Sequence, residues 1–263
     1  MDYRWAEGRN ERLPALAAEL VRLNPDVVVT HSIPGIRAAQ QATSTIPIVM
    51  GTSSDPVRLG LVKSLAKPGG NTTGVSSQLI ELSAKRLELL KEAVPNLRQV
   101  AVLSNPTNVT AREAVKETEG AAQKLGVRVR SFEVRKEPTE LETEFAAILR
   151  WRPDALIVIP DPLIVGAHSA RIVEFAAKNR LPAMGGQSGF VSAGGLISYG
   201  GDFSEGWRLA ARYVDRILKG AKPADLPVEQ LSKFELAINL KTAKALGLKI
   251  PPSVLGRADQ LIE

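Results

Sequence analysis

The chain alternates between short aliphatic runs and longer segments whose apolar residues recur at helical spacing. The clearest helical pattern spans 81–94, through Leu82, Leu87 and Leu90, and a second helix is expected over 204–220, ending at Gly220. Further helices are expected at 34–43, 55–67, 111–126, 140–150, 169–180 and 240–247. Strands are expected at 26–32, 46–54, 72–78, 99–108, 127–134, 155–162, 181–187, 195–202 and 234–239. This alternation predicts βαβ units and parallel sheets that are covered on both faces.

The expected strands are too many for a single sheet in a chain of 263 residues. Two βα runs, before and after about residue 97, suggest two similar lobes, and the stretch GAKPADLPVEQ at 220–230 has the composition of a linker. With 44% hydrophobic and 24% charged residues, the composition is that of an ordinary soluble globular protein. None of the apolar runs approaches the roughly 20 residues that a membrane-spanning helix needs.

A net charge of +6 raises the question of nucleic-acid binding. The basic residues are interspersed with acidic ones, as in AREAVKETEGAAQK at 111–124, which is typical of solvated helix faces. We therefore expect no nucleic-acid partner. The sequence contains no cysteine, which excludes disulfides, thiolate metal sites and cysteine nucleophiles.

Nearly every expected strand ends in small, neutral hydrogen-bonding residues. These ends read Thr30-His31-Ser32, Gly51-Thr52-Ser53-Ser54-Asp55, Ser104-Asn105-Pro106-Thr107-Asn108, Pro160-Asp161-Pro162, Gly185-Gly186-Gln187 and Gly200-Gly201-Asp202. Ligands of open parallel sheets bind beyond the carboxyl ends of the strands. The residues that we expect to contact a ligand are Thr52, Ser53, Ser54, Ser104, Asn105, Asn108, Asp161, Gln187 and His31. Serine, threonine and asparagine in these places are equally suited to cap the following helix.

Four titratable residues near these ends have alternative interpretations. Asp55 precedes Pro56, a sequence typical of a helix N-cap, so capping is its expected role. Asp161 follows a fully apolar strand, and a half-buried carboxylate there needs a partner. A ligand ammonium or hydroxyl, a cap or an internal salt bridge would each serve. His31 lies at a strand end and is a candidate for the cleft, whereas His168 is expected on the surface of a helix.

Sequence signatures of catalysis and of cofactor binding are absent. The sequence has neither Gly-x-Gly-x-x-Gly after a first strand nor a phosphate loop with Gly-Lys-Ser/Thr, and its two histidines lack metal-ligand spacing. The stretch GGQSGF at 185–190 lacks the first glycine of a nucleophile elbow. Neutral polar groups without an acid–base pair describe a site that binds and does not react. We therefore predict a solute receptor that has no catalytic residue, metal or cofactor.

Several long stretches resemble one family, the solute-binding proteins of ABC transporters related to tryptophan- and amino-acid-binding lipoproteins. The resemblance covers essentially the whole chain and is carried by EGRNERLPALAAELV (7–21), ATSTIPIVM (42–50), DPVRLGLVKSLAKPGGNTTGVS (55–76), LISYGGDFSEGWRLAARYVDRILKGAKPADLPVEQ (196–230) and FELAINLKTAKALGLKIPPSVLGRAD (234–259). It implies the periplasmic binding protein type I fold, in which two α/β lobes are joined by three crossovers. The implied lobes are 1–97 plus 201–227, and 98–200 plus 228–263.

The resemblance also implies a mechanism. The ligand, a small organic solute such as an amino acid or an aromatic acid, lies between the lobes, a hinge closes over it, and the receptor delivers it to a membrane permease served by a separate ATPase. Residues of this sequence that match such a site are Ser53, Ser54 and Ser77, for the ligand carboxylate, and Asp161, for its ammonium. The implied location is periplasmic, or outside the cytoplasm on a membrane anchor.

The sequence departs from the family pattern at two places. Members usually begin with a signal peptide, a first strand and a first helix, whereas this sequence starts at Met1, inside the expected second strand, with no export signal. We therefore expect lobe 1 to lack a central strand and its helix, and we expect a swapped or dimeric arrangement to cover the open sheet edge. The second departure is Ile33, which stands where the family often has a small hydroxylated residue.

Two other classes of function use similar features. The ligand-sensing domain of a transcription regulator has the same fold, but it would need a helix-turn-helix segment ahead of Met1. An enzyme acting on a small metabolite is the third reading, and it would show turnover where a receptor shows only saturable binding.

Overall fold

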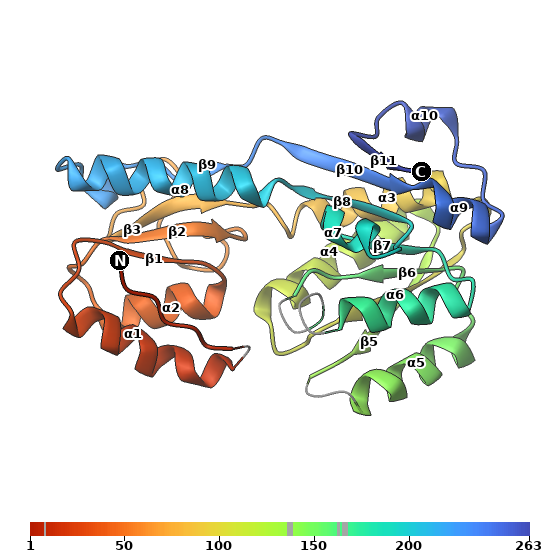
Figure 1. The fold of residues 1–263 in the computed structure, drawn as a ribbon, viewed down its shortest axis with the longest axis horizontal. Helices are drawn as coiled ribbons and strands as arrows, with labels where there is room; N and C mark the ends of the chain where they lie inside the picture. The colour runs from red at the N-terminus through yellow and green to blue at the C-terminus, as the bar shows by residue number, and fades with distance from the viewer. Residues whose placement is uncertain (8, 136–138, 162–163, 165–167) are drawn as a thin grey trace. The chain divides into compact units, whose positions relative to one another are not determined.

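The computed structural model describes residues 1–7, 9–135, 139–161, 164 and 168–263 (Figure 1). The chain divides into two compact units: unit 1 is Met1–Gln78 with Asp202–Lys233, and unit 2 is Leu79–Gly201 with Phe234–Glu263. The chain passes from one unit to the other three times, as the predicted fold requires. The expected lobes change at residues 97 and 227, whereas the compact units change at 78 and 233. The division into functional lobes stays a prediction.

Unit 1 is built on a parallel sheet with the strand order β1-β2-β3-β9. Its strands are β1 (Val28–Thr30), β2 (Ile48–Ser53), β3 (Thr72–Ser76) and β9 (Glu229–Gln230). Its helices are α1 (Leu13–Arg22), α2 (Ile33–Ala42) and α8 (Phe203–Leu218), with the short 3-10 helices η1 (Asn10–Arg12) and η3 (Pro223–Asp225). Residues 1–6 form neither helix nor strand.

Helix α8 covers one face of the unit 1 sheet because its apolar residues fall on one side. Leu209, Tyr213 and Ile217, at i, i+4 and i+8, are buried against Val49 and Val75 of the central strands. The opposite face packs on α2, where Ala39 meets Val28 and Ile48. Figure 1 shows the resulting order of helix, sheet and helices within this unit.

Strands β2 and β3 approach each other more closely than side chains would normally allow. Gly74 of β3 has φ +133°, and a Cβ built on it would lie 2.3 Å from the carbonyl oxygen of Met50. The register of the two strands shifts between Met50 and Ser53. Only glycine fits at position 74, because any side chain would collide with the backbone of the neighbouring strand.

Unit 2 is built on a seven-stranded sheet with the order β11-β10-β8-β7-β6-β4-β5. The described pairs are parallel except that of β10 with β8. The strands are β4 (Gln99–Ser104), β5 (Arg128–Glu133), β6 (Ala155–Val158), β7 (Ala183–Gly185), β8 (Ile197–Gly201), β10 (Phe234–Asn239) and β11 (Gln260–Ile262). The helices are α3 (Leu82–Ala93), α4 (Val109–Leu125), α5 (Thr139–Trp151), α6 (Ser169–Lys178), α7 (Ser188–Ser192), α9 (Leu240–Leu246) and α10 (Pro252–Leu255).

Each face of the unit 2 sheet has its own core, because side chains alternate along a strand. Val100 and Val102 of β4 pack with residues of α3, α4, α9 and α10. Ala101 and Leu103 point the other way, toward α5 and α6, where Phe145 and Phe175 stack at 3.9 Å between ring centroids. The buried strands β4 and β6 therefore read as continuous apolar runs in the sequence.

The helix expected over 55–67 is wrong, because this segment folds as a series of turns and bends. Gly60 has φ +68°, which interrupts any helix there. Asp55 therefore caps no helix: its Oδ1 accepts a hydrogen bond from the backbone N–H of Arg58 at 2.9 Å and closes a turn. The buried side chains of Leu59, Leu61 and Val62 supplied the apolar spacing that suggested a helix.

Candidate functional site

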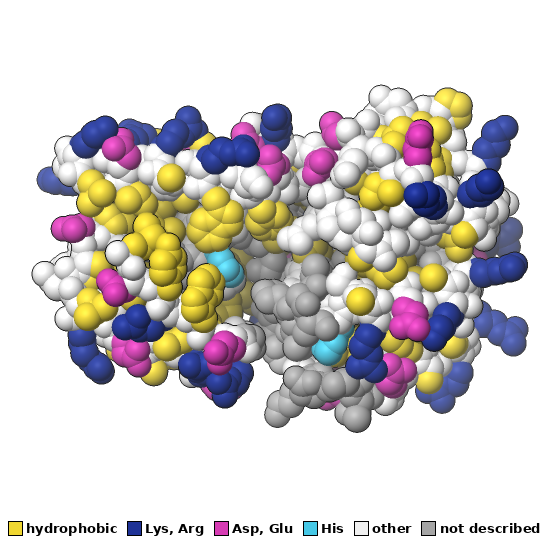
Figure 2. All heavy atoms as spheres, viewed as in Figure 1, with side chains coloured by type: hydrophobic (Ala, Val, Ile, Leu, Met, Phe, Trp, Pro, Cys, Tyr) yellow, Lys and Arg dark blue, Asp and Glu magenta, His cyan; other side chains and the backbone are white. Residues whose placement is uncertain are grey.

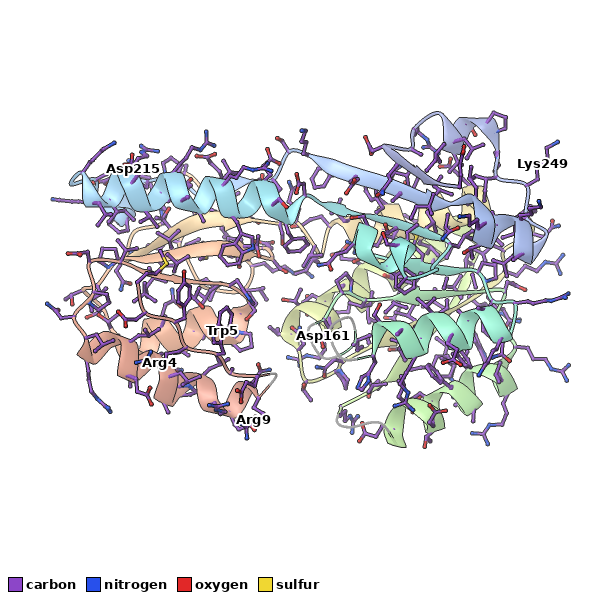
Figure 3. All side chains as sticks on the ribbon, viewed as in Figure 1. Arg4, Trp5, Arg9, Asp161, Asp215 and Lys249 are labelled. Atoms are coloured by element: carbon purple, nitrogen blue, oxygen red, sulfur yellow. The ribbon has the colours of Figure 1, made fainter. Side chains whose placement is uncertain are left out.

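The polar segment after β4 meets Asp161, which follows β6 and is 5% exposed (Figure 3). Asn105 donates from Nδ2 to Asp161 Oδ1 at 3.2 Å, and Asn108 donates from Nδ2 to Oδ2 at 2.6 Å. The backbone N–H of Ile164 also donates to Oδ1, at 3.4 Å. Three residues predicted from two strand ends thus form one hydrogen-bonded cluster, Asn105, Asn108 and Asp161, which we call the Asp161 cluster.

Backbone groups fix the orientation of both asparagine amides. Asn105 Oδ1 accepts from the N–H of Thr107 at 3.0 Å and from its hydroxyl at 2.7 Å. Asn108 is the N-cap of α4, and its Oδ1 accepts from the N–H of Thr110 at 2.9 Å. Because both carbonyl oxygens are engaged as acceptors, the amide nitrogens must face Asp161 as donors. The carboxylate thus accepts hydrogen bonds from two side-chain amides whose orientation is fixed.

The other two predicted residues of unit 2 lie apart from these hydrogen bonds. Ser104 is buried, and its hydroxyl lies 3.1 Å from that of Ser131 on β5. Gln187 is half-buried at the start of α7, where its side chain makes no capping hydrogen bond. The prediction that these two residues contact a ligand is neither supported nor opposed by their hydrogen bonds.

In unit 1 the structure brings Ser53, Ser54 and Ser77 together at the ends of β2 and β3, and all three are buried. Ser53 donates its hydroxyl to the carbonyl oxygen of Ser54 at 2.8 Å, and Ser77 donates its hydroxyl to the carbonyl oxygen of Ser53 at 3.0 Å. These two hydroxyls must rotate before they can donate to a ligand carboxylate. Thr52, on the same stretch, is buried as well.

His31 follows β1 and packs edge-on against Trp207 of α8, with 5.7 Å between ring centroids and 75° between planes. The imidazole ring is partly enclosed, and the loss of water around it lowers the pKa of His31 from its ordinary value. His31 is therefore neutral at pH 7. From the sequence, Trp207 was predicted only as part of a helix, since nothing in the 204–220 pattern marks it as a site residue.

Arg86 on α3 is a buried residue of unit 2 that was not predicted from the sequence. Its Nε donates to the carbonyl oxygen of Tyr199 at 2.8 Å, and its Nη1 donates to that of Leu79 at 3.3 Å. Its Nη2 has no hydrogen-bond partner in the described part of the chain. Burial lowers the pKa of Arg86 to about 10, so the guanidinium stays charged at pH 7. A signal was available, because Arg86 lies four residues from both Leu82 and Leu90 on the apolar side of its helix.

The expectation that His168 lies on the surface is wrong. It precedes α6 and is only 5% exposed, because α6 turns this end toward the core that contains Ile172. Pro162, part of one predicted strand end, lies outside the described residues.

Across the described ranges, no group of three or more histidine and acidic residues is arranged to hold a metal ion. None of the described helices combines the length and hydropathy of a membrane span.

Comparison with known proteins places the chain in a family. The family model described as ABC transporter substrate binding protein matches residues 1–262. The chain belongs to this family. The predicted family is thereby confirmed, and members of the ABC transporter substrate binding protein family act outside the cytoplasm.

Relatives support the same assignment. A tyrosine-binding protein of Clostridioides difficile (strain R20291) is 31% identical over 252 residues, which cover 95% of this chain and 71% of that protein. The structure of an ABC domain from Streptococcus pneumonia in complex with L-Trp is 31% identical, with a TM-score of 0.89, and the match covers 99% of this chain and 89% of that one.

A periplasmic binding ribose operon repressor protein from Lactobacillus acidophilus shows the fold alone. It is 15% identical, with a TM-score of 0.59, and the match covers 88% of this chain and 82% of that one. The predicted periplasmic binding protein type I fold, α/β with sheets flanked by helices, is confirmed by these likenesses.

Proposed function

We propose that this substrate-binding protein captures a free amino acid with an aromatic side chain. The observation that carries the proposal is the Asp161 cluster, a buried carboxylate held by two neutral amides at the carboxyl ends of the strands. A ligand ammonium is the natural partner of such a carboxylate, because charge-assisted hydrogen bonds are stronger than those between neutral groups. The aromatic side chain is inferred from the relatives, one named a tyrosine-binding protein and one solved with L-Trp.

The remaining assignments belong to the same proposal. Hydroxyls and backbone amides around Ser53, Ser54 and Ser77 hold the ligand carboxylate, because hydroxyl and N–H groups are natural donors to an anion. The residues proposed to line the rest of the site are Thr52, Ser104, Asn105, Asn108, Gln187 and His31. The ligand is held by strand ends of both units and leaves chemically unchanged.

A thermal-shift screen tests the function directly. The chain is melted with each of a panel of amino acids, aromatic acids and sugars. A ligand that binds only the folded state stabilises it by RT ln(1 + [L]/Kd), about 2.7 kcal/mol at a hundredfold excess over Kd. We expect L-tyrosine, L-tryptophan or L-phenylalanine to raise the melting temperature. A melt that sugars shift and amino acids leave unchanged would contradict the proposal.

Asp161→Asn tests the role of the carboxylate. We expect it to weaken amino-acid binding by a few kcal/mol, as is typical when one partner of a buried charge pair is lost. Isothermal titration measures the affinity, and the melting temperature without ligand reports any loss of folding. Asp215→Asn, on the exposed side of α8, is the control and leaves the affinity unchanged. Equal affinities for Asp161→Asn and the parent chain would remove the ammonium assignment.

We also propose the partners that such a receptor serves. The loaded protein, in the periplasm or anchored outside the cytoplasm, delivers its ligand to a membrane permease driven by a separate ATPase. Two copies are proposed to associate along β1, which ends the strand order of the unit 1 sheet and exposes Val29. Light scattering that shows only monomer at high concentration would contradict this association.

A further inference from the structure

An indole ring covers the carboxyl end of β2 in unit 1. A Cβ built on Gly51 would lie 2.4 Å from Trp207 Cζ3 and 2.7 Å from Cη2. The ring of Trp207 therefore rests directly on the backbone of β2, and only glycine at position 51 allows this contact. Gly51 is followed on β2 by Thr52 and Ser53, two residues of the proposed ligand site.

A second glycine brings the helix to this position. Gly206 of α8 faces β2, and a Cβ there would lie 2.7 Å from Thr52 Cγ2 and 3.3 Å from the carbonyl oxygen of Gly51. The absence of side chains on both Gly51 and Gly206 lets α8 lie against the strand end. Trp207, the next residue, is thereby placed over that end.

The indole is fixed on one side and open on the other. Its edge contact with His31 and its contact with Gly51 hold the ring, yet Trp207 remains 42% exposed. Figure 2 shows hydrophobic side chains gathered on one face of unit 1. The exposed large apolar residues of this unit include Trp207, Val29, Tyr3 and Trp5. The contact of Trp207 with Gly51 places its ring near the carboxyl end of β2, where ligands of such sheets bind.

We propose that Trp207 is the specificity-determining residue that stacks on the aromatic side chain of the ligand. The inference rests on the proposed function and adds the group that selects the ligand class. An indole held in place loses little side-chain freedom when a second ring packs on it, and aromatic pairs are favoured by about 0.5–1.5 kcal/mol beyond the area that they bury. An aliphatic ligand gains the burial without this addition. The neutral His31 leaves the stack uncharged.

The test compares ligand classes in Trp207→Leu and Trp207→Phe. Isothermal titration with L-tyrosine, L-phenylalanine and L-leucine gives the affinity of each variant. We expect Trp207→Leu to lose about 3- to 10-fold in affinity for the two aromatic ligands, from the stacking term. We expect its affinity for L-leucine to stay within about twofold, because burial in the pocket is retained. Trp207→Phe keeps most of the aromatic preference. Trp5→Leu, an exposed residue of the same unit, is the control with no change.

Fluorescence supplies a second readout. The sequence has three tryptophans, so Trp5→Phe with Trp151→Phe leaves Trp207 as the single emitter. L-phenylalanine, which is transparent at the wavelength that excites indole, should change its emission on binding.

Each outcome has a distinct meaning. Equal losses for L-leucine and the aromatic ligands would show a structural role and overturn the inference, as would an unchanged affinity for all three. Both results leave the proposed function intact. A parent chain that binds none of the three amino acids would overturn the function and the inference together.

Discussion

Arg86 is the residue whose burial is hardest to reconcile with simple packing. A guanidinium without exposed surface carries a large desolvation cost, which is met here by hydrogen bonds to the carbonyl oxygens of Tyr199 and Leu79. Leu79 begins unit 2 after the first passage of the chain, and Tyr199 lies two residues before the second. Arg86 therefore ties together the two places where the chain enters and leaves this unit.

Replacing Arg86 tests that role. We expect Arg86→Met to lower the free energy of unfolding by roughly 2–4 kcal/mol, because two buried carbonyl oxygens lose their donor while the removal of a buried charge offsets part of the cost. The urea midpoint measures the change. Lys85→Met, next to Arg86 but with its side chain paired to Glu88 at the surface, should shift stability by less than about 0.5 kcal/mol. Equal midpoints for the two variants would contradict the role of Arg86.

At the scale of elements, the pairing of β2 with β3 depends on a missing side chain. Gly74→Ala places a methyl group 2.3 Å from Met50 O and demands a positive φ from an L-residue. We expect a loss of more than about 3 kcal/mol, since backbone strain and a backbone clash add together. The thermal midpoint of the variant, or a failure to fold, provides the measurement.

Gly120→Ala is the matched control for that variant. Gly120 lies inside α4, and a Cβ there would meet nothing within 4 Å. The same chemical change should stabilise the chain by about 0.5–1 kcal/mol, because alanine is the better helix former. If both variants destabilised the chain equally, the clash at Gly74 would not be the cause.

Some helices and strands could be predicted from the sequence alone, and others could not. The apolar runs of β4 and β6 and the one-sided apolar pattern of α8 predicted these elements because burial alone determines such patterns. The prediction of a helix over 55–67 failed because Leu59, Leu61 and Val62 are buried although they lie in turns and bends. The spacing of apolar residues gives no information about the positive φ of Gly60.

For the candidate site, the sequence predicted three residues that the structure joins by hydrogen bonds, while their contact with a ligand stays a prediction. The rule that ligands meet the carboxyl ends of strands singled out Asn105, Asn108 and Asp161, which the fold does join. The placement of Trp207 was not predicted, because it depends on Gly51, which is distant in sequence, and on the close approach of α8 to β2 that Gly51 and Gly206 allow. Contacts of this kind do not change the periodicity of apolar residues, so a single sequence does not reveal them.

At the scale of the whole molecule, each unit has its own hydrophobic core. Leu209 and Tyr213 belong to that of unit 1, and Leu87 and Phe145 belong to those of unit 2. We expect calorimetry of the ligand-free chain to show a van't Hoff enthalpy below the calorimetric enthalpy, because the units unfold in separate steps. Arg86→Met should lower the midpoint only of the unfolding step that belongs to unit 2.

Ligand should change this behaviour. If the ligand is held by both units, as proposed, it stabilises both, and saturation should bring the two steps closer together and raise both midpoints. A ligand that raised only one midpoint would be bound by one unit alone. A single two-state transition without ligand would contradict the independence of the cores.

Asn108 has two roles, as the cap of α4 and as a donor to Asp161, and together they limit how this protein can change over evolutionary time. Its Oδ1 caps α4 by accepting a hydrogen bond from the N–H of Thr110, and its Nδ2 donates a hydrogen bond to Asp161. A mutation of Asn108 that alters the Asp161 cluster also weakens α4, so changes in ligand preference are expected more readily at proposed site residues that cap no helix, such as Gln187. An engineer converting the protein into a biosensor faces the same constraint and would leave Asn108 alone.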